Sequence, residues 1–169
     1  IMKKSNIVFT FATAEVNIVG QLFIKITELF TGKLKLKKLY DEYISENRPP
    51  EFFWDDAVDK LKFNLITYFQ DGSYIPTTGK LIVIANHAFG VADGLSICSM
   101  ISKVRQDYKM VTHKVLRQAD AVKDKILPID FNETKEALLT NINTRKEAEK
   151  FLKNDGVIIL FPSGRIATK

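Results

Sequence analysis

A histidine and an aspartate follow an apolar run, with a spacing that suits acid–base chemistry. Residues 81–85 are apolar and three of them are β-branched, which predicts a strand covered on both faces in a parallel sheet. His87 follows at the carboxyl end of this strand, the edge where open α/β sheets bind ligands. A neutral imidazole takes a proton near pH 7, and a carboxylate on its far nitrogen fixes the tautomer. We interpret His87 as a general base and Asp93 as the group that orients it.

The loop between these two residues can fold back on itself. Gly90 lies between them and Gly94 follows Asp93, so the chain can turn tightly before residues 95–101 continue as a helix. In the alternative interpretation, Asp93 is only the N-cap of that helix and His87 is a strand-end residue whose hydrogen bonds are satisfied. One His–Asp pair does not decide between the two interpretations.

A second polar loop leaves another apolar run. Residues 156–161 contain no charge and predict a buried strand, which the segment 162–165 (PSGR) follows. In a parallel sheet this loop opens on the same edge as His87. Its backbone amides, the Ser163 hydroxyl and the Arg165 guanidinium could hold a phosphate. The alternative is a simple Pro-Gly turn with a surface arginine.

Together the two loops resemble those of the glycerolipid acyltransferase superfamily, which includes the lysophospholipid and 1-acylglycerol-phosphate acyltransferases. Residues 86–94 (NHAFGVADG) are similar to the first motif of that family. Residues 161–164 (FPSG) are similar to its third motif, and the two stand in the family's order. Residues 126–129 (ILPI) fall where the family has a looser second motif. The resemblance covers about residues 50–169.

Two departures from the family pattern indicate a particular branch. Five residues separate His87 from Asp93, where most of the family has four. This spacing resembles the branch of hemolysin-like proteins and ornithine-lipid acyltransferases. In the third motif, Ser163 replaces the common glutamate, and Arg165 follows Gly164 without an intervening residue. The identity of the acceptor therefore stays open.

The resemblance implies acyl transfer without a metal or an organic cofactor. His87 would deprotonate the hydroxyl or amine of a lysolipid or glycerol-phosphate-like acceptor, which attacks the thioester of acyl-CoA or acyl-carrier protein. Asp93 would orient His87. This mechanism requires no acyl-enzyme, so we expect Cys98 to pack in its helix. The residues implied in binding substrate or supporting the site are Asn86, Gly90, Phe161, Pro162, Ser163, Gly164 and Arg165.

Helical segments are expected ahead of the sheet. Residues 7–30 carry apolar side chains at three- and four-residue steps, which predicts an amphipathic helix that Gly32 ends. Residues 33–40 interleave four lysines with three leucines, which fits either a solvated helix face or a segment on an anionic membrane surface. After the linker 48–50 (RPP), a second helix is expected, with core positions at Trp54, Val58, Leu61, Leu65 and Phe69.

The rest of the pattern predicts an α/β fold with a largely parallel central sheet flanked by helices. Strands are expected at 81–85, 108–113, 125–131 and 156–161, and helices at 95–101 and 133–154. Inward candidates on the last helix are Ala137, Leu138, Ile142, Ala148 and Leu152. We expect an N-terminal, membrane-contacting helical segment at 1–50 and an acyltransferase-like α/β domain at 51–169. Because the sequence stops directly after a strand and its loop, we expect this domain to be incomplete.

Composition narrows the expected environment of the chain. Its 25 basic and 20 acidic residues give a net charge of +5, which favours anionic partners. No stretch reaches the roughly 20 apolar residues that a membrane span needs. The single cysteine excludes a disulfide within the chain and favours a reducing compartment. We therefore expect a cytoplasmic protein that is peripheral on the inner face of the membrane.

Other classes of function stay as alternatives. A metal-dependent hydrolase could use His87, Asp93 and His113 as ligands, but their spacing matches no known metal set, so no metal is expected. Nucleic acid is not an expected partner, because basic and aromatic residues do not interleave. The main alternative to the acyltransferase is a non-catalytic lipid-binding protein with the same fold.

Overall fold

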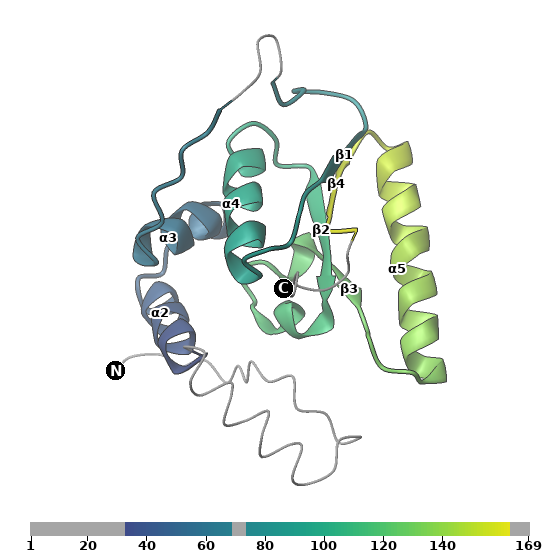
Figure 1. The fold of residues 1–169 in the computed structure, drawn as a ribbon, viewed down its shortest axis with the longest axis horizontal. Helices are drawn as coiled ribbons and strands as arrows, with labels where there is room; N and C mark the ends of the chain where they lie inside the picture. Colours follow the sequence, from purple (N-terminus) through teal and green to yellow (C-terminus); the bar gives the residue numbers. More distant parts are fainter. Residues whose placement is uncertain (1–32, 69–73, 163–169) are drawn as a thin grey trace, which may run out of the picture.

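The chain folds around a four-stranded parallel sheet, shown in Figure 1. The computed structural model describes residues 33–68 and 74–162. The strands are β1 (Leu81–Ile84), β2 (Tyr108–His113), β3 (Ile126–Ile129) and β4 (Val157–Leu160), and their order in the sheet is β1-β4-β2-β3. The helices are α2 (Lys33–Ser45), α3 (Phe53–Lys60), α4 (Val91–Ser102) and α5 (Lys135–Lys153). Short 3₁₀ helices are η1 (Pro50–Phe52), η2 (Lys114–Gln118) and η3 (Lys123–Lys125).

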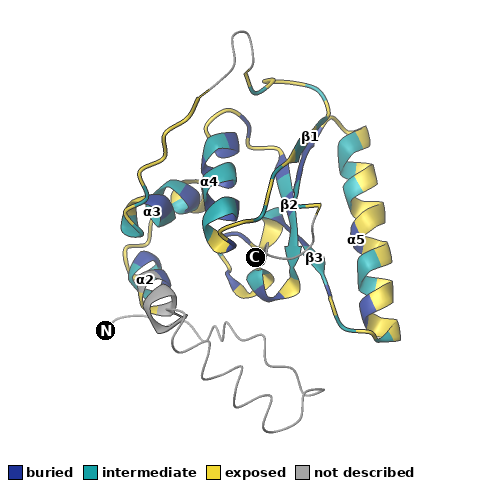
Figure 2. Cartoon of the chain, in the orientation of Figure 1, coloured by how far each residue is buried: buried dark blue, intermediate teal, exposed yellow. Residues whose placement is uncertain are grey.

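Helices cover the two faces of the sheet. Helix α4 lies on one face with α3 and α2 beyond it, and α5 lies on the other face (Figure 1). The main core is on the α4 side, where Cys98 and Leu95 of α4 pack with Val157 and Ile159 of β4. Buried residues are concentrated between α4 and the strands, whereas much of α5 is exposed (Figure 2). The predicted α/β fold with a parallel sheet is therefore confirmed.

Trp54 fixes α3 to the sheet. Its indole Nε1 donates a hydrogen bond of 2.6 Å to the hydroxyl of Tyr108 at the start of β2, and both side chains are buried. The Ser99 hydroxyl of α4 donates to the carboxylate of Asp55 on α3. Burial raises the pKa of the Tyr108 hydroxyl well above its usual value, so Tyr108 stays neutral. These contacts set the position of α4, whose first turn carries Asp93.

The second predicted helix is shorter than its apolar pattern suggests. We expected core positions as far as Leu65 and Phe69, but α3 ends at Lys60. Lys62 takes a left-handed conformation, with φ of 56°, and its N–H donates to the Asp59 carbonyl. The Phe63 N–H donates to the Val58 carbonyl, which completes a Schellman cap. Leu65 is consequently exposed, and Phe69 lies outside the described residues.

Strand β1 is covered on one face only, so the prediction of cover on both faces is wrong. Ile82 is 50% exposed and Ile84 is 63% exposed. Helix α5 packs mainly on β3 and β4. Because β1 is an edge strand, its side chains on the α5 side lie beyond the reach of that helix. The alternate residues Leu81 and Val83 face the main core.

Two inward positions predicted for α5 are also wrong. Leu138 and Ile142 are exposed, whereas Ala137 and Thr144 are buried. The Thr144 hydroxyl donates to the carbonyl of Pro128 in β3, at 2.6 Å. The two buried residues of α5, Ala137 and Thr144, are therefore small, which allows close approach to the strands.

The N-terminal predictions fall largely outside the described residues. The helix expected at 7–30 and its end at Gly32 lie there. The lysine- and leucine-rich residues 33–40 lie in α2, and their contact with a membrane stays a prediction. Tyr40 of α2 is buried and stacks edge-on against Phe53. Among the helices within residues 33–68 and 74–162, none combines the length and the apolar composition that a membrane span requires.

A buried arginine holds together the segments that enter the sheet. The Arg105 side chain is 2% exposed and forms a two-point ion pair with the Asp107 carboxylate. It also donates to the carbonyls of Gly79, just before β1, and Asp155, just before β4. This arginine therefore fixes where the two strands that lead to the candidate site begin.

Replacing Arg105 with methionine should lower the free energy of unfolding by about 2 to 3 kcal/mol, because several carbonyls lose their donor. Urea unfolding would measure the loss. Arg145→Met is the matched control: Arg145 is 82% exposed and pairs with Glu149 on the surface of α5, so its loss should be about 0.5 kcal/mol or less. Equal losses for the two variants would contradict the role given to Arg105.

The same interaction predicts an effect of pH. Hydrogen bonding to Arg105 holds the pKa of the Asp107 carboxyl below its usual value. A carboxyl with a depressed pKa stabilises the fold above its unfolded-state pKa, and this stabilisation is lost as pH falls through the folded-state pKa. The stability difference between wild type and Arg105→Met should therefore narrow below about pH 4.

Candidate active site

The candidate site lies where the chain leaves β1 and enters α4. In β1, side chains alternate between the core face and the open face, and Val83 is on the core face. The chain passes from β1 through Ala85 and Asn86 to His87, then forms a short turn before α4 begins at Val91. His87 is thus held between the carboxyl end of an edge strand and the first turn of a helix.

The structure brings His87 and Asp93 together. The distance from Nδ1 of His87 to Oδ2 of Asp93 is 3.3 Å, and the two side chains are 21% and 17% exposed. The Nδ1 atom is buried and has no hydrogen-bond partner among the described residues. Its contact with Asp93 does not have hydrogen-bond geometry. Without substrate, catalytic hydrogen bonds are often long or poorly aligned, and they tighten when substrate binds. The pair can therefore act as a base and its orienting carboxylate.

Asp93 also holds the loop in place. The backbone N–H of Phe89 donates to Oδ2 of Asp93 at 2.9 Å. A carboxylate oxygen has two lone pairs, so the same atom can accept from Phe89 and from the imidazole. The N-cap of α4 is Gly90, and Asp93 lies in the first turn. The alternative in which Asp93 is the N-cap is therefore wrong. Its carboxylate nevertheless contacts both the backbone of the loop, at Phe89, and the imidazole of His87.

Gly90 makes the turn that places Asp93 beneath the loop. Its φ of 61° and ψ of −119° suit the first central position of a type II′ turn. The Ala92 N–H donates to the Phe89 carbonyl at 3.4 Å, across this turn. Gly94, which we also expected in the turn, lies within α4 instead.

Replacing Gly90 with alanine should therefore distort the turn and cost about 1 to 3 kcal/mol in the free energy of unfolding. Any activity that depends on His87 and Asp93 should fall with it. Gly94→Ala is the matched control, because a Cβ there meets Met110 Sδ at an ordinary 3.5 Å and the backbone is helical. Thermal unfolding of both variants tests this, and an unchanged Gly90→Ala protein would contradict it.

The second predicted loop contributes one clearly placed side chain. Phe161 directly follows β4, and its ring stacks on the imidazole of His87, with centroids 4.3 Å apart and planes inclined by 26°. Pro162 is exposed. Ser163, Gly164 and Arg165 lie outside the described residues, so their proposed binding of an anion stays a prediction. Asn86 is exposed beside His87, and its supporting role also stays a prediction.

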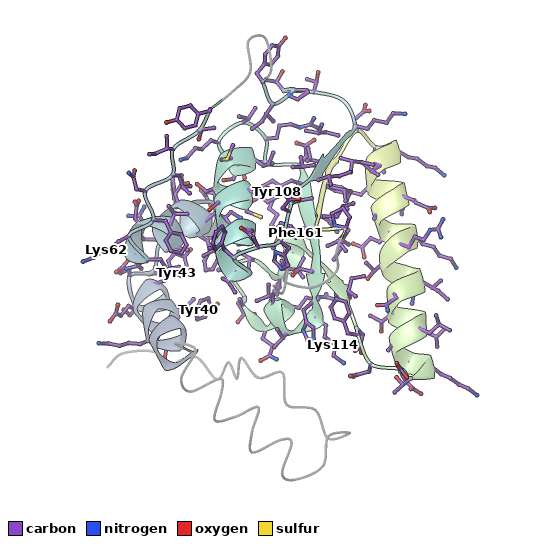
Figure 3. The ribbon with its side chains drawn as sticks, in the orientation of Figure 1. Tyr40, Tyr43, Lys62, Tyr108, Lys114 and Phe161 are labelled. Atoms are coloured by element: carbon purple, nitrogen blue, oxygen red, sulfur yellow. The ribbon has the colours of Figure 1, made fainter. Side chains whose placement is uncertain are left out.

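The second histidine belongs to a different arrangement. His113 ends β2, its Nδ1 accepts a hydrogen bond from the Val115 N–H, and its ring stacks on Phe131. Burial lowers the pKa of His113. Lys114, labelled in Figure 3, pairs with the carboxylate of Asp130. Within the described parts of the chain, no three His, Cys, Asp or Glu side chains converge on a point that could hold a metal ion.

Cys98 packs in the core, as expected. It is fully buried in α4, and its sulfur lies 3.7 Å from the sulfur of Met110. Burial strongly raises the pKa of the thiol, which keeps it protonated. A protonated, inaccessible thiol is unsuited to act as a nucleophile.

Two contacts at the site were not predicted from the sequence: the stack of Phe161 on His87 and the hydrogen bond from Phe89 to Asp93. The first joins strands that are distant in the sequence, and the second involves a backbone group. No protein-family model, curated protein or solved structure matches the chain.

Proposed function

We propose that the chain is an acyltransferase that moves a fatty acyl group from acyl-CoA or acyl-carrier protein to a lysolipid or glycerol-phosphate-like acceptor. The observation that carries this proposal is the pairing of His87 with Asp93 at the carboxyl end of β1, with Nδ1 3.3 Å from the carboxylate. The proposal also uses the resemblance of both loops to the motifs of glycerolipid acyltransferases. Neither loop would be sufficient alone.

In the proposed reaction His87 is the general base. Because Nδ1 faces Asp93, Nε2 is the nitrogen that takes the proton of the acceptor hydroxyl or amine. The acceptor oxygen or nitrogen then attacks the thioester carbonyl, and a new C–O or C–N bond forms. As the C–S bond breaks, the departing thiolate takes the proton from the imidazolium. Asp93 stabilises the imidazolium between the two steps.

The surface beside the pair suits a substrate with hydrocarbon chains. Phe89 is 80% exposed and Val91 is 51% exposed, and both lie between His87 and Asp93 in the sequence. Apolar side chains at the edge of a polar site favour a ligand with a polar head and an apolar tail. This favours a lysolipid acceptor over a small water-soluble one.

The head group of the acceptor would be bound by the loop after β4. Ser163, Gly164 and Arg165 provide the hydroxyl, the backbone amides and the guanidinium that a phosphate or carboxylate needs. A lipid acceptor would require the protein to work at a membrane surface, which we propose is the inner face. The lysines of α2 would contribute to this contact.

The proposal is tested by incubating the protein with radiolabelled acyl-CoA or acyl-carrier protein and a panel of lysolipid acceptors in vesicles. Label that moves into a lipid product supports the acyltransferase and identifies its acceptor. Folded protein that binds the vesicles but transfers no label with either donor would instead favour the non-catalytic lipid-binding protein. Circular dichroism of the same sample shows whether the protein is folded.

A further inference from the structure

We propose that Phe161 is a positioning residue, which holds the imidazole of His87 in the orientation that a general base requires. This inference rests on the proposed function for its effect on catalysis. The motif resemblance implies only that Phe161 belongs to a substrate-binding loop. The stack on His87 instead gives its side chain a role inside the site, exerted through the base.

The geometry favours such a role. The two rings lie 4.3 Å apart between centroids, with an angle of 26° between their planes, which is face-to-face contact. Phe161 directly follows β4, which is paired on both sides, with β1 and with β2. Its side chain is partly buried against the main core. Figure 3 labels Phe161 near the end of the sheet where β4 ends. A phenyl ring that is held against the core in this way limits the rotation of the imidazole that stacks on it.

Restricting the imidazole matters because its two nitrogens are not equivalent. In the observed orientation, Nδ1 is buried and faces Asp93, which leaves Nε2 for the acceptor. If the ring rotated by half a turn about its Cβ–Cγ bond, both nitrogens would move away from these positions. One edge of the ring faces Asp93, and Phe161 packs against its face. Together they keep the base in one orientation before substrate binds, which lowers the entropy cost of reaching the transition state.

The chain contains a matched control at the same edge of the sheet. His113 stacks on Phe131, with centroids 5.7 Å apart and planes inclined by 16°. Its Nδ1 accepts the Val115 N–H, so the backbone already fixes that ring. Phe131 is 46% exposed and follows β3. Both pairs stack a phenyl ring on an imidazole. A backbone hydrogen bond also orients His113, whereas Nδ1 of His87 has no such bond within the described residues.

Nuclear magnetic resonance can test this without any substrate, because the chain has only two histidines. In ¹⁵N-histidine-labelled protein with neutral rings, His87 should show a protonated Nδ1 and an unprotonated Nε2. Phe161→Leu should remove the upfield ring-current shift of His87 and produce a mixture of tautomers. Phe161→Tyr should keep both properties. Phe131→Leu should shift only the signals of His113.

The kinetic expectation follows from the same geometry. Phe161→Leu should lower kcat for acyl transfer about 10- to 100-fold with little change in the acceptor KM, because orientation of the base is lost. Phe161→Tyr should restore most of kcat, and Phe131→Leu should leave it unchanged. If Phe161→Leu lowered kcat only by destabilising the fold, its unfolding temperature would fall as well. Circular dichroism measures that temperature.

The inference is overturned if Phe161→Leu leaves the tautomer of His87 unchanged, or if Phe131→Leu perturbs His87 as strongly. It is also overturned if the tautomer becomes mixed while kcat stays the same. Failure of the proposed function gives a different result. In that case wild-type protein transfers no acyl group, but Phe161→Leu still changes the tautomer of His87 alone.

Discussion

Replacing His87 with glutamine should lower kcat for acyl transfer by about 10² to 10⁴, which is the usual contribution of a positioned general base. Glutamine fills similar space but cannot take a proton near neutral pH. The acceptor hydroxyl or amine would then have to lose its proton without a base, whereas both substrates would still bind. Steady-state kinetics with a labelled acyl donor measure the loss, which should fall on kcat more than on KM.

His113→Gln is the matched control for this change. His113 is the other histidine of the chain. It ends β2, which β4 separates from β1, and its Nδ1 accepts a backbone hydrogen bond. Its replacement should leave kcat within a small factor of wild type. Acyl transfer that survives His87→Gln at the wild-type rate would remove His87 as the base. A loss of equal size in both variants would instead point to an effect on the fold.

Replacing Asp93 with asparagine should lower kcat by about 10²-fold or more, without opening the loop. The amide oxygen of asparagine can still accept the Phe89 N–H, as the carboxylate does at 2.9 Å. In that orientation the same amide oxygen also faces Nδ1 of His87, because the Phe89 N–H and Nδ1 both contact Oδ2 of Asp93. What the variant loses is the negative charge that stabilises the imidazolium.

Two comparisons separate the chemical role of Asp93 from its structural one. Asp93→Ala removes the Phe89 contact as well, so it should lower the unfolding temperature more than Asp93→Asn. Asp130→Asn changes the carboxylate near the other histidine, His113, and should leave kcat unchanged. Normal kcat for Asp93→Asn would show that the carboxylate serves only to hold the loop, and the proposed mechanism would then be wrong.

Local patterns were sufficient to predict most elements of the fold. Strand β2 has the predicted bounds, Tyr108–His113. Buried and half-buried residues alternate over its first four positions, and polar residues bracket it. The long helix α5 was predicted to within two residues at each end, since Thr134 provides an N-cap that accepts from the Ala137 N–H. The apolar run at 81–85 likewise formed β1, which ends at Ile84. These signals are short-range and therefore visible in the sequence.

Features that depend on strand order were not predictable in this way. The apolar run of β1 suggested full burial, but β1 is at the edge because β4 inserts between it and β2. Ile82 and Ile84 are exposed as a result. The end of α3 depends on a non-glycine residue, Lys62, in a left-handed conformation, which the apolar periodicity does not reveal.

The same distinction holds at the candidate site. The sequence placed His87 and Asp93 in one loop, and a turn at Gly90 was sufficient to bring them together. The contact of Phe161 with His87 requires β4 to lie directly beside β1, which only the assembled sheet shows. The residues after Pro162 are outside the described part of the chain, so the anion-binding half of the site stays a prediction.

The central claim is that His87 and Asp93 act as one catalytic unit in acyl transfer. A double-mutant cycle tests it most directly, with kcat measured for wild type, His87→Gln, Asp93→Asn and the double variant. If Asp93 acts through His87, the double variant should be about as slow as His87→Gln alone. Two losses that multiply, or folded wild-type protein that transfers no acyl group to any acceptor, would contradict the claim.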